Sequence, residues 1–202
     1  IAAGEICAFI GHNGAGKTTT LKACCGLLKP DGGTITVNGI DIQKDPIACK
    51  KIMAYIPDNP DLYEFLTGYE YLNFVADMYG VSEADRKARM EALAERLDIK
   101  NALPNLISEC SHGMKQKIAV IGALIHGLDP IAAHELKEIM AEHCRNGGAI
   151  FFSTHVLEVA EKLCDNVAII KNGKLIAHGT MDSVRGDGSL ERVFLELEDH
   201  KD

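Results

Sequence analysis

The sequence predicts an α/β fold in which a core of β elements is interrupted by an inserted helical segment. A short apolar run, Ile6–Ile10, ends at a glycine-rich turn and precedes a helical pattern over residues 18–28. Further β patterns follow residue 149, whereas the composition from about residue 68 to 125 is helical. We therefore expect a core subdomain made of residues 1–67 and 126–202, and a helical subdomain made of residues 68–125.

Several short segments are strand candidates. Ile6–Ile10 is apolar throughout, which is typical of a strand buried on both faces. The pairs Asn38-Gly39 and Asn172-Gly173 each separate two short β patterns, and their ease at positive φ favours two-residue hairpin turns. Residues 52–56 and 149–153 are two more candidates. Because α/β sheets bind ligands at the carboxyl edge of their strands, the residues that follow these segments are candidates for a site.

Two helices are predicted with particular clarity. One opens at Ser82 with a sequence that resembles a capping box, and it carries Met90, Leu93, Ala94 and Leu97 at helical spacing. This pattern indicates an amphipathic helix packed on a core. Residues 189–198 predict a last amphipathic helix near the end of the chain.

The composition excludes several classes of protein. The chain has 202 residues, 47% of them apolar and 25% charged, as expected of an ordinary globular chain. No apolar run reaches the roughly 18 to 20 residues that a membrane-spanning helix needs. The formal net charge of -8 disfavours nucleic acid as a partner. Seven cysteines, an odd number without a C-x-x-C pair, indicate a reduced environment and no disulfide framework.

A glycine-rich loop carries the strongest chemical signal. Residues 11–18 match the pattern G-x-x-x-x-G-K-[ST] between a buried strand and a helix. Glycines let backbone N–H groups turn toward phosphate oxygens, and the helix N-terminus adds further donors. Lys17 would reach the β and γ phosphates, the Thr18 hydroxyl would bind Mg2+, and Thr19 could bond the α phosphate. The predicted site for a nucleoside triphosphate comprises Gly11, His12, Asn13, Gly14, Ala15, Gly16, Lys17, Thr18 and Thr19.

Together with further motifs, this loop makes the whole chain resemble the nucleotide-binding domain of an ATP-binding cassette (ABC) transporter, and most of all a bacterial exporter-type subunit. Residues 110–117 occupy the place of the family signature, usually Leu-Ser-Gly-Gly-Gln; Ser111 and Gly113 match it and His112 departs from it. The resemblance implies that Ser111, His112 and Gly113 act in trans, on the γ phosphate bound by an opposite protomer. Considered without the resemblance, Ser111 is a helix N-cap.

Three shorter segments also resemble family motifs. Residues 127–130 resemble the D-loop, which implies that Asp129 lies at a dimer interface. Residues 153–155 resemble the switch-histidine motif, which implies a catalytic role for His155 at the γ phosphate. Residues 55–58 occupy the place of the Q-loop, where Asp58 replaces the usual Gln. A carboxylate there could hold Mg2+ through a water but cannot donate as an amide does.

One family element is absent from the sequence. The family has an apolar strand ending in the Walker B Asp, then a catalytic Glu, before the D-loop; here His126 runs directly into Gly127. We expect that strand to lie beside the strand that precedes the glycine-rich loop. Its loss would leave buried backbone N–H and C=O groups without hydrogen-bond partners, at a cost of about 1–3 kcal/mol each. Either roughly a dozen residues are missing between 126 and 127, or the protein cannot hydrolyse ATP. The N-terminal β segment of the family, with the aromatic residue that usually stacks on adenine, is also missing from this sequence, which favours the first interpretation. Glu135 and Glu138 are poor substitutes for the catalytic Glu, because they lie in a predicted helix after the D-loop and not at the end of a strand.

The resemblance implies an ATPase subunit of an ABC transporter. It would pair head to tail around two ATP and Mg2+, as a homodimer or as a heterodimer with another ABC ATPase. Its helical subdomain would bind a separate transmembrane permease at the inner, cytoplasmic face of the cell membrane. Two alternatives remain: a nucleotide-sensing ABC-type module that does not hydrolyse ATP, and a soluble non-transport ABC ATPase. GTP is disfavoured because no Asn-Lys-x-Asp motif occurs.

Overall fold

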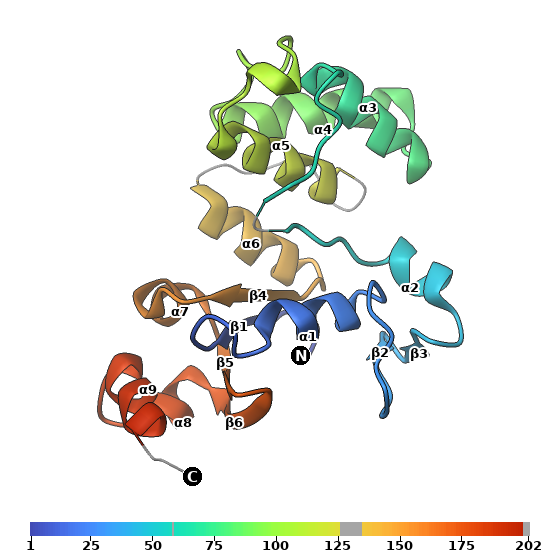
Figure 1. The fold of residues 1–202 in the computed structure, drawn as a ribbon. Coiled ribbons are helices and arrows are strands. Elements are labelled where there is room, and N and C mark those ends of the chain that lie inside the picture. The colour runs from blue at the N-terminus through green and yellow to red at the C-terminus, as the bar shows by residue number, and fades with distance from the viewer. Residues whose placement is uncertain (58, 126–134, 200–202) are drawn as a thin grey trace. The chain divides into compact units, whose positions relative to one another are not determined.

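The computed structural model describes residues 1–57, 59–125 and 135–199, which divide into two compact units (Figure 1). We call Ile1–Gly33 with Lys137–Asp202 the sheet unit, and Thr34–Leu136 the helical unit. In the described part of the chain, no helix is both long enough and apolar enough to cross a bilayer.

The sheet unit is built on a four-stranded sheet with the strand order β4-β1-β5-β6. Its strands are β1 (Ile6–Ile10), β4 (Ile150–Thr154), β5 (Asn166–Lys171) and β6 (Lys174–Thr180). β1 pairs in parallel with β4 on one edge and with β5 on the other, and β6 is antiparallel to β5. All five residues of β1 are buried, as its apolar sequence predicts.

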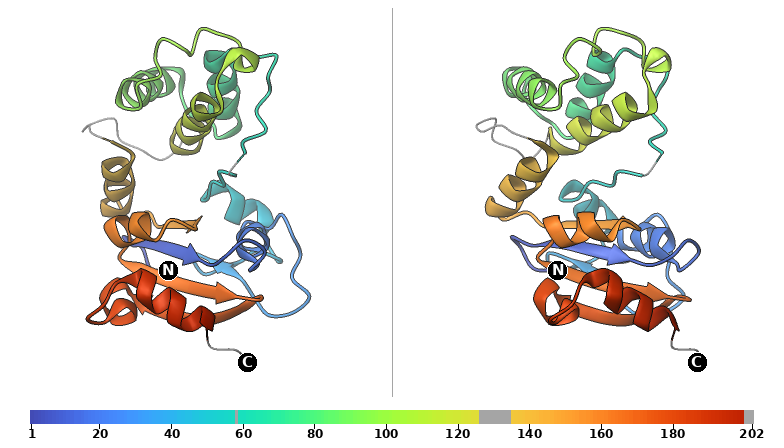
Figure 2. Two further views of the ribbon diagram at one scale, coloured as in Figure 1. Left: turned by 60° about the vertical axis from the view of Figure 1, so that its left-hand side comes forward. Right: turned by 90° about the vertical axis from the view of Figure 1, so that its left-hand side faces the viewer.

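The helices of the sheet unit are α1 (Lys17–Cys24), α7 (Leu157–Leu163), α8 (Met181–Arg185) and α9 (Leu190–Asp199), together with α6 (Glu135–Arg145) from Lys137 onward. α7 contacts β1 and β4, while α8 and α9 contact each other, as Figure 2 shows in red. Successive side chains of β1 point to opposite faces of the sheet and pack in two different clusters. Ala8 and Ile10 pack in a core with Ala160 of α7, whereas Phe9 packs with Ile170. The predicted last helix is confirmed at residues 190–199.

The helical unit contains a small hairpin and four helices within the described residues. The hairpin pairs β2 (Thr36–Val37) with β3 (Ile40–Asp41). The α-helices are α2 (Pro46–Lys51), α3 (Gly68–Met78), α4 (Glu83–Arg96) and α5 (His112–Leu124), and a 3-10 turn (η1) spans Ile107–Glu109. α3, α4 and α5 pack on one another, and Met90, Leu93 and Ala94 of α4 are buried as predicted.

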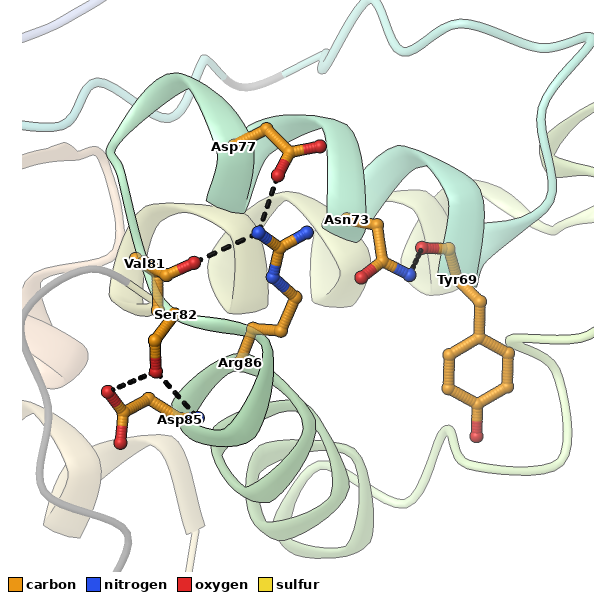
Figure 3. Close-up of polar contacts among 7 residues, drawn as sticks. All are labelled: Tyr69, Asn73, Asp77, Val81, Ser82, Asp85 and Arg86. Carbon is orange, nitrogen blue, oxygen red and sulfur yellow. Dashed lines mark hydrogen bonds and ion pairs between the residues drawn. The ribbon is translucent and has the colours of Figure 1, made fainter.

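The link between α3 and α4 shows why α4 begins where the sequence predicts. The Ser82 hydroxyl accepts a bond from the Asp85 N–H at 3.2 Å, which caps the helix. Arg86 donates to the Asp77 carboxylate on α3 and to the Val81 carbonyl, the latter at 2.9 Å (Figure 3). One guanidinium therefore fixes the end of one helix against the start of the next.

Both predicted Asn-Gly turns are confirmed. Asn172 and Gly173 join β5 to β6 with φ of 48° and 77°, and Asn38 and Gly39 join β2 to β3 with φ of 48° and 78°. The two turns have nearly identical backbone geometry, because Asn and Gly tolerate the left-handed region better than other residues.

Two predictions on local structure are wrong. Residues 52–56 form no strand: Ile52 is the C-cap of α2 and is 49% exposed, and Ile56 is 41% exposed, so neither isoleucine is buried in a core. The helix predicted over residues 18–28 ends at Cys24, because Gly26 turns left-handed at φ 66° and its N–H bonds back to the Ala23 carbonyl.

The expected position of the absent family strand is also wrong. Both edges of β1 are already paired, with β4 and with β5, so the backbone of β1 does not need another strand. In the described part of the chain, β4 and β6 are the outer strands of this sheet, and the five residues of β4 are only partly buried. A further parallel strand would therefore pair with β4. The junction between residues 126 and 127 lies outside the described residues.

All seven cysteines are free thiols, and Cys7, Cys49, Cys110, Cys144 and Cys164 are buried. Burial, followed by the neighbouring Cys7 and Asp165, raises the pKa of the Cys164 thiol to about 12. Burial likewise raises the pKa of Cys7. These groups therefore pack as small apolar side chains at neutral pH.

His143 of α6 predicts how stability depends on pH. Its ring packs so tightly on Gly148 that a Cβ there would lie 2.1 Å from Nε2, and burial lowers the pKa of the imidazole. The unfolded chain therefore takes up the proton first, and the free energy of unfolding should fall as the pH drops through about 6.5. Urea unfolding at pH 7.5 and 5.5 should show a smaller loss in His143→Gln than in the native protein. Equal losses would contradict this assignment.

Candidate nucleotide-binding site

The glycine-rich loop lies where α/β sheets bind ligands. It joins the carboxyl end of β1 to the N-terminus of α1, and the N-cap residue Gly16 (φ 106°) offers no side-chain hydrogen bond. The first turn of α1 contains no acidic residue. Backbone donors and the positive end of the helix dipole thus point at the loop without a carboxylate to neutralise them, which favours an anion.

Lys17 lies over this loop. Its Nζ donates to the Gly11 carbonyl at 2.6 Å and to the His12 carbonyl at 2.9 Å. Among the described residues it forms no ion pair. The ammonium is therefore held inside the loop by weakly basic carbonyl oxygens, where a phosphate oxygen could replace them as its partner.

Three glycines of the loop are needed for different reasons. A Cβ on Gly11 would lie 2.5 Å from the Ile170 carbonyl oxygen and 2.9 Å from Ile170 Cγ2, so the close approach of two strands excludes any side chain. Gly14 and Gly16 have φ of 83° and 106°, which L side chains rarely adopt. Asn13 and Gly14 are exposed at the tip of the loop, whereas Ala15 is buried beneath it.

The sheet register places His155 at the same edge as the loop. Ile10 is level with Thr154 on the neighbouring strand, so Gly11 and His155 are the next residues on adjacent parallel strands. His155 is exposed, and the Thr154 hydroxyl accepts a bond from the Val156 N–H at 2.9 Å, which fixes the turn that follows. The sheet unit thus brings His155 to the strand end beside the loop.

The signature residues lie in the helical unit. Ser111 is the N-cap of α5, and its hydroxyl accepts from the Met114 N–H at 3.3 Å. Ser111, His112 and Gly113 are all exposed at the start of this helix, whose first turn has no acidic residue. The N-cap interpretation is confirmed, and three exposed residues surround the donor-rich end of α5. Asp58 and Asp129 lie outside the described residues.

The residues present suit Mg2+ held mainly by a nucleotide. Thr18 and Thr19 are exposed hydroxyls in the first turn of α1, beside the phosphate loop. No group of three or more His, Cys, Asp or Glu within the described residues could hold a metal ion by itself. Mg2+ prefers one or two protein oxygens, phosphate oxygens and water, and the Thr18 hydroxyl is such an oxygen.

One part of the site is missed by sequence reasoning. Ile170 packs beneath the loop, and the Gly173 N–H donates to the Ala15 carbonyl at 3.0 Å. The sequence predicts the Asn172-Gly173 turn but not its contact with Ala15. That contact joins residues far apart in the chain and has no local pattern.

The loop, the helix that follows it and the lysine folded over it define a P-loop nucleotide-binding protein of the α/β class. The family model described as "ABC transporter" matches residues 1–130, well over half of the chain. The chain therefore belongs to the ABC transporter family, as its ATP-binding component.

Curated relatives support this membership. The ABC-type transporter ATP-binding protein EcsA of Bacillus subtilis is 35% identical over 210 residues, covering 96% of this chain and 85% of the relative. The ABC transporter ATP-binding protein NatA of Bacillus subtilis is 34% identical over 197 residues, covering 91% and 80%.

Solved structures agree on the fold. A structure described as the ATP binding subunit of an ABC transporter has a TM-score of 0.89 at 35% identity, covering 98% of this chain and 89% of that one. CbiO1 from Clostridium perfringens, described as part of the ABC transporter complex cbiONQ, has a TM-score of 0.75 at 24% identity, covering 97% and 88%. The predicted fold class, an ABC ATPase core with β elements and inserted helices, is confirmed.

The packing of Gly11 predicts a large stability effect. Gly11→Ala should lower the free energy of unfolding by about 3 kcal/mol, because the new methyl meets the backbone of Ile170. Gly113→Ala is the control, since a Cβ there meets no atom within 4 Å and replaces a helical glycine. We expect it to be neutral or to stabilise by about 0.5 kcal/mol in urea unfolding. Equal effects would show that Ile170 yields to the methyl.

Proposed function

We propose that this protein binds Mg·ATP in the loop from Gly11 to Thr19 and hydrolyses it to drive transport by a separate membrane subunit. The observation that carries the proposal is the Lys17 ammonium, which the Gly11 and His12 carbonyls hold inside the glycine-rich loop. An ammonium at this position can stabilise the negative charge that develops on the γ phosphate during hydrolysis.

The residues divide the work of hydrolysis. Backbone donors of the loop bind the phosphates, and Lys17 stabilises the charge that develops when water attacks in line. Bound Mg2+ would neutralise the phosphate oxygens, with the Thr18 hydroxyl among its ligands. His155, exposed at the neighbouring strand end, orients the reactants at the γ phosphate. Asp58 would reach the metal through a water.

A second copy, or a related ABC ATPase, would complete each site. Ser111, His112 and Gly113 expose the N-terminus of α5, which offers donors and a positive dipole end to a phosphate from another protomer. Two protomers would pair head to tail around two ATP, with Asp129 at their interface. Binding of ATP would then favour the paired state, because each nucleotide contacts both protomers.

The helical unit offers a surface for a membrane partner. Tyr63, Phe65 and Phe74 are 48%, 76% and 40% exposed, and the Tyr63 ring lies 5.9 Å from Phe65 and 5.6 Å from Phe74. An exposed aromatic cluster marks a binding surface. We assign it to a transmembrane permease subunit, which would place this protein in the cytoplasm, peripheral to the inner face of the cell membrane.

The general base is assigned to a Glu that this sequence does not contain. The alignment with EcsA spans 210 residues, more than the 202 of this chain, so the relative has residues without a counterpart here. An internal gap of this kind is what the interpretation of residues missing between 126 and 127 requires. In the protein purified from its natural source, the tryptic peptide that contains His126 and Gly127 should then be heavier than this sequence predicts, by the mass of about a dozen residues. An equal mass would favour the module that binds ATP without hydrolysing it.

Lys17→Ala tests the proposed activity. We expect ATP turnover to fall at least about 100-fold, because the charge on the γ phosphate loses its cation. Lys22→Ala is the matched control, since Lys22 is an exposed lysine in the last turn of the same helix. Turnover by phosphate release should be near the native rate in that variant. Equal turnover in the native protein and Lys17→Ala would overturn the proposal.

A further inference from the structure

The end of β5 forms a floor under the nucleotide loop. Ile170 is 4% exposed and clusters with Ala15 and Phe9. Its carbonyl oxygen and Cγ2 lie so close to Gly11 that a Cβ there would be 2.5 Å and 2.9 Å from them. Its Cδ1 would lie 3.5 Å from a Cβ on Gly16. One side chain of β5 therefore supports both ends of the loop.

The turn after β5 adds a polar contact to this floor. The Gly173 N–H donates to the Ala15 carbonyl at 3.0 Å, and the Gly173 Cα would lie 3.7 Å from a Cβ on Gly16. Ala15 is only 1% exposed, and its methyl group is packed in the cluster with Ile170. The Ala15 peptide is thus held on both its apolar and its polar side.

This bond sets the direction of a donor in the loop. A trans peptide is planar, so the carbonyl of Ala15 and the N–H of Gly16 point in opposite directions. Because the carbonyl points at Gly173, the Gly16 N–H points away from the β5–β6 turn. Gly16 is the N-cap of α1 and directly precedes Lys17, so its N–H belongs to the donors that would surround the phosphates.

The bond depends on the conformation of the turn. Asn172 and Gly173 both have positive φ, and the pairing of β5 with β6 shifts register between Ile169 and Ile170, just before the turn. Such irregularities re-aim the groups that follow them. A residue that disfavours positive φ at position 173 would rotate the N–H away from Ala15.

We propose that Gly173 is a positioning residue of the nucleotide site: its N–H holds the Ala15 carbonyl and thereby aims the Gly16 N–H at the bound phosphates. This inference rests on the proposed binding of ATP by the loop. Part of the affinity for ATP would then depend on the β5–β6 turn, which lies in the sheet unit with the nucleotide loop but more than 150 residues from it in the sequence.

The chain provides a matched control for the test. Gly39 occupies the equivalent turn position at φ 78° in the helical unit, and a Cβ on either glycine meets no atom within 4 Å. Valine should therefore cost similar backbone strain at both positions. Calorimetric titration with Mg·ATP should give about tenfold weaker binding for Gly173→Val and a change within about twofold for Gly39→Val. Gly173→Asn should restore most of the affinity, because Asn tolerates positive φ.

Equal losses of affinity in Gly173→Val and Gly39→Val, or no loss in either, would overturn the proposal. If Gly173→Val does not fold, amide hydrogen exchange in the native protein decides: Mg·ATP should slow exchange at Gly173 and leave Gly39 unchanged. Unchanged exchange at Gly173 would also overturn it. Failure of the native protein to bind Mg·ATP would instead reject the proposed function.

Discussion

The pairing of β1 on both of its edges is the constraint on which the rest of the sheet unit depends. Its five residues are buried, and its backbone bonds to β4 and to β5 in parallel. Every ladder bond satisfies a polar group that burial would otherwise penalise. Because this pairing fixes the register, it also fixes where the glycine-rich loop begins and which residues of the neighbouring strands lie beside it.

Local features of this protein could be predicted from sequence because local chemistry decides them. Asn172-Gly173 and Asn38-Gly39 form turns of the same geometry in the two units, and Ser111 and Ser82 cap their helices with their own hydroxyls. The strand β1 follows from five consecutive apolar residues, and the loop from glycines at fixed spacing before a lysine. The family model of the ABC transporter matches residues 1–130, which contain β1, the glycine-rich loop and the capped start of α5.

What sequence reasoning missed depends on contacts between distant segments. Residues 52–56 have a strand-like composition, yet they belong to neither sheet of the described part of the chain. The order β4-β1-β5 places two later strands on either side of the first, which no pattern within β1 could reveal. Likewise, the need for glycine at position 11 comes from the Ile170 carbonyl across the sheet.

The buried thiols give this protein an intrinsic reporter of its own opening. Alkylating reagents attack only an accessible thiolate, and burial both shields Cys164 and raises its pKa to about 12. Cys164 lies beside the start of β5, and Cys7 lies within β1. Their rate of modification at neutral pH is therefore set by how often the central strands separate, so it follows the integrity of the sheet without any introduced probe.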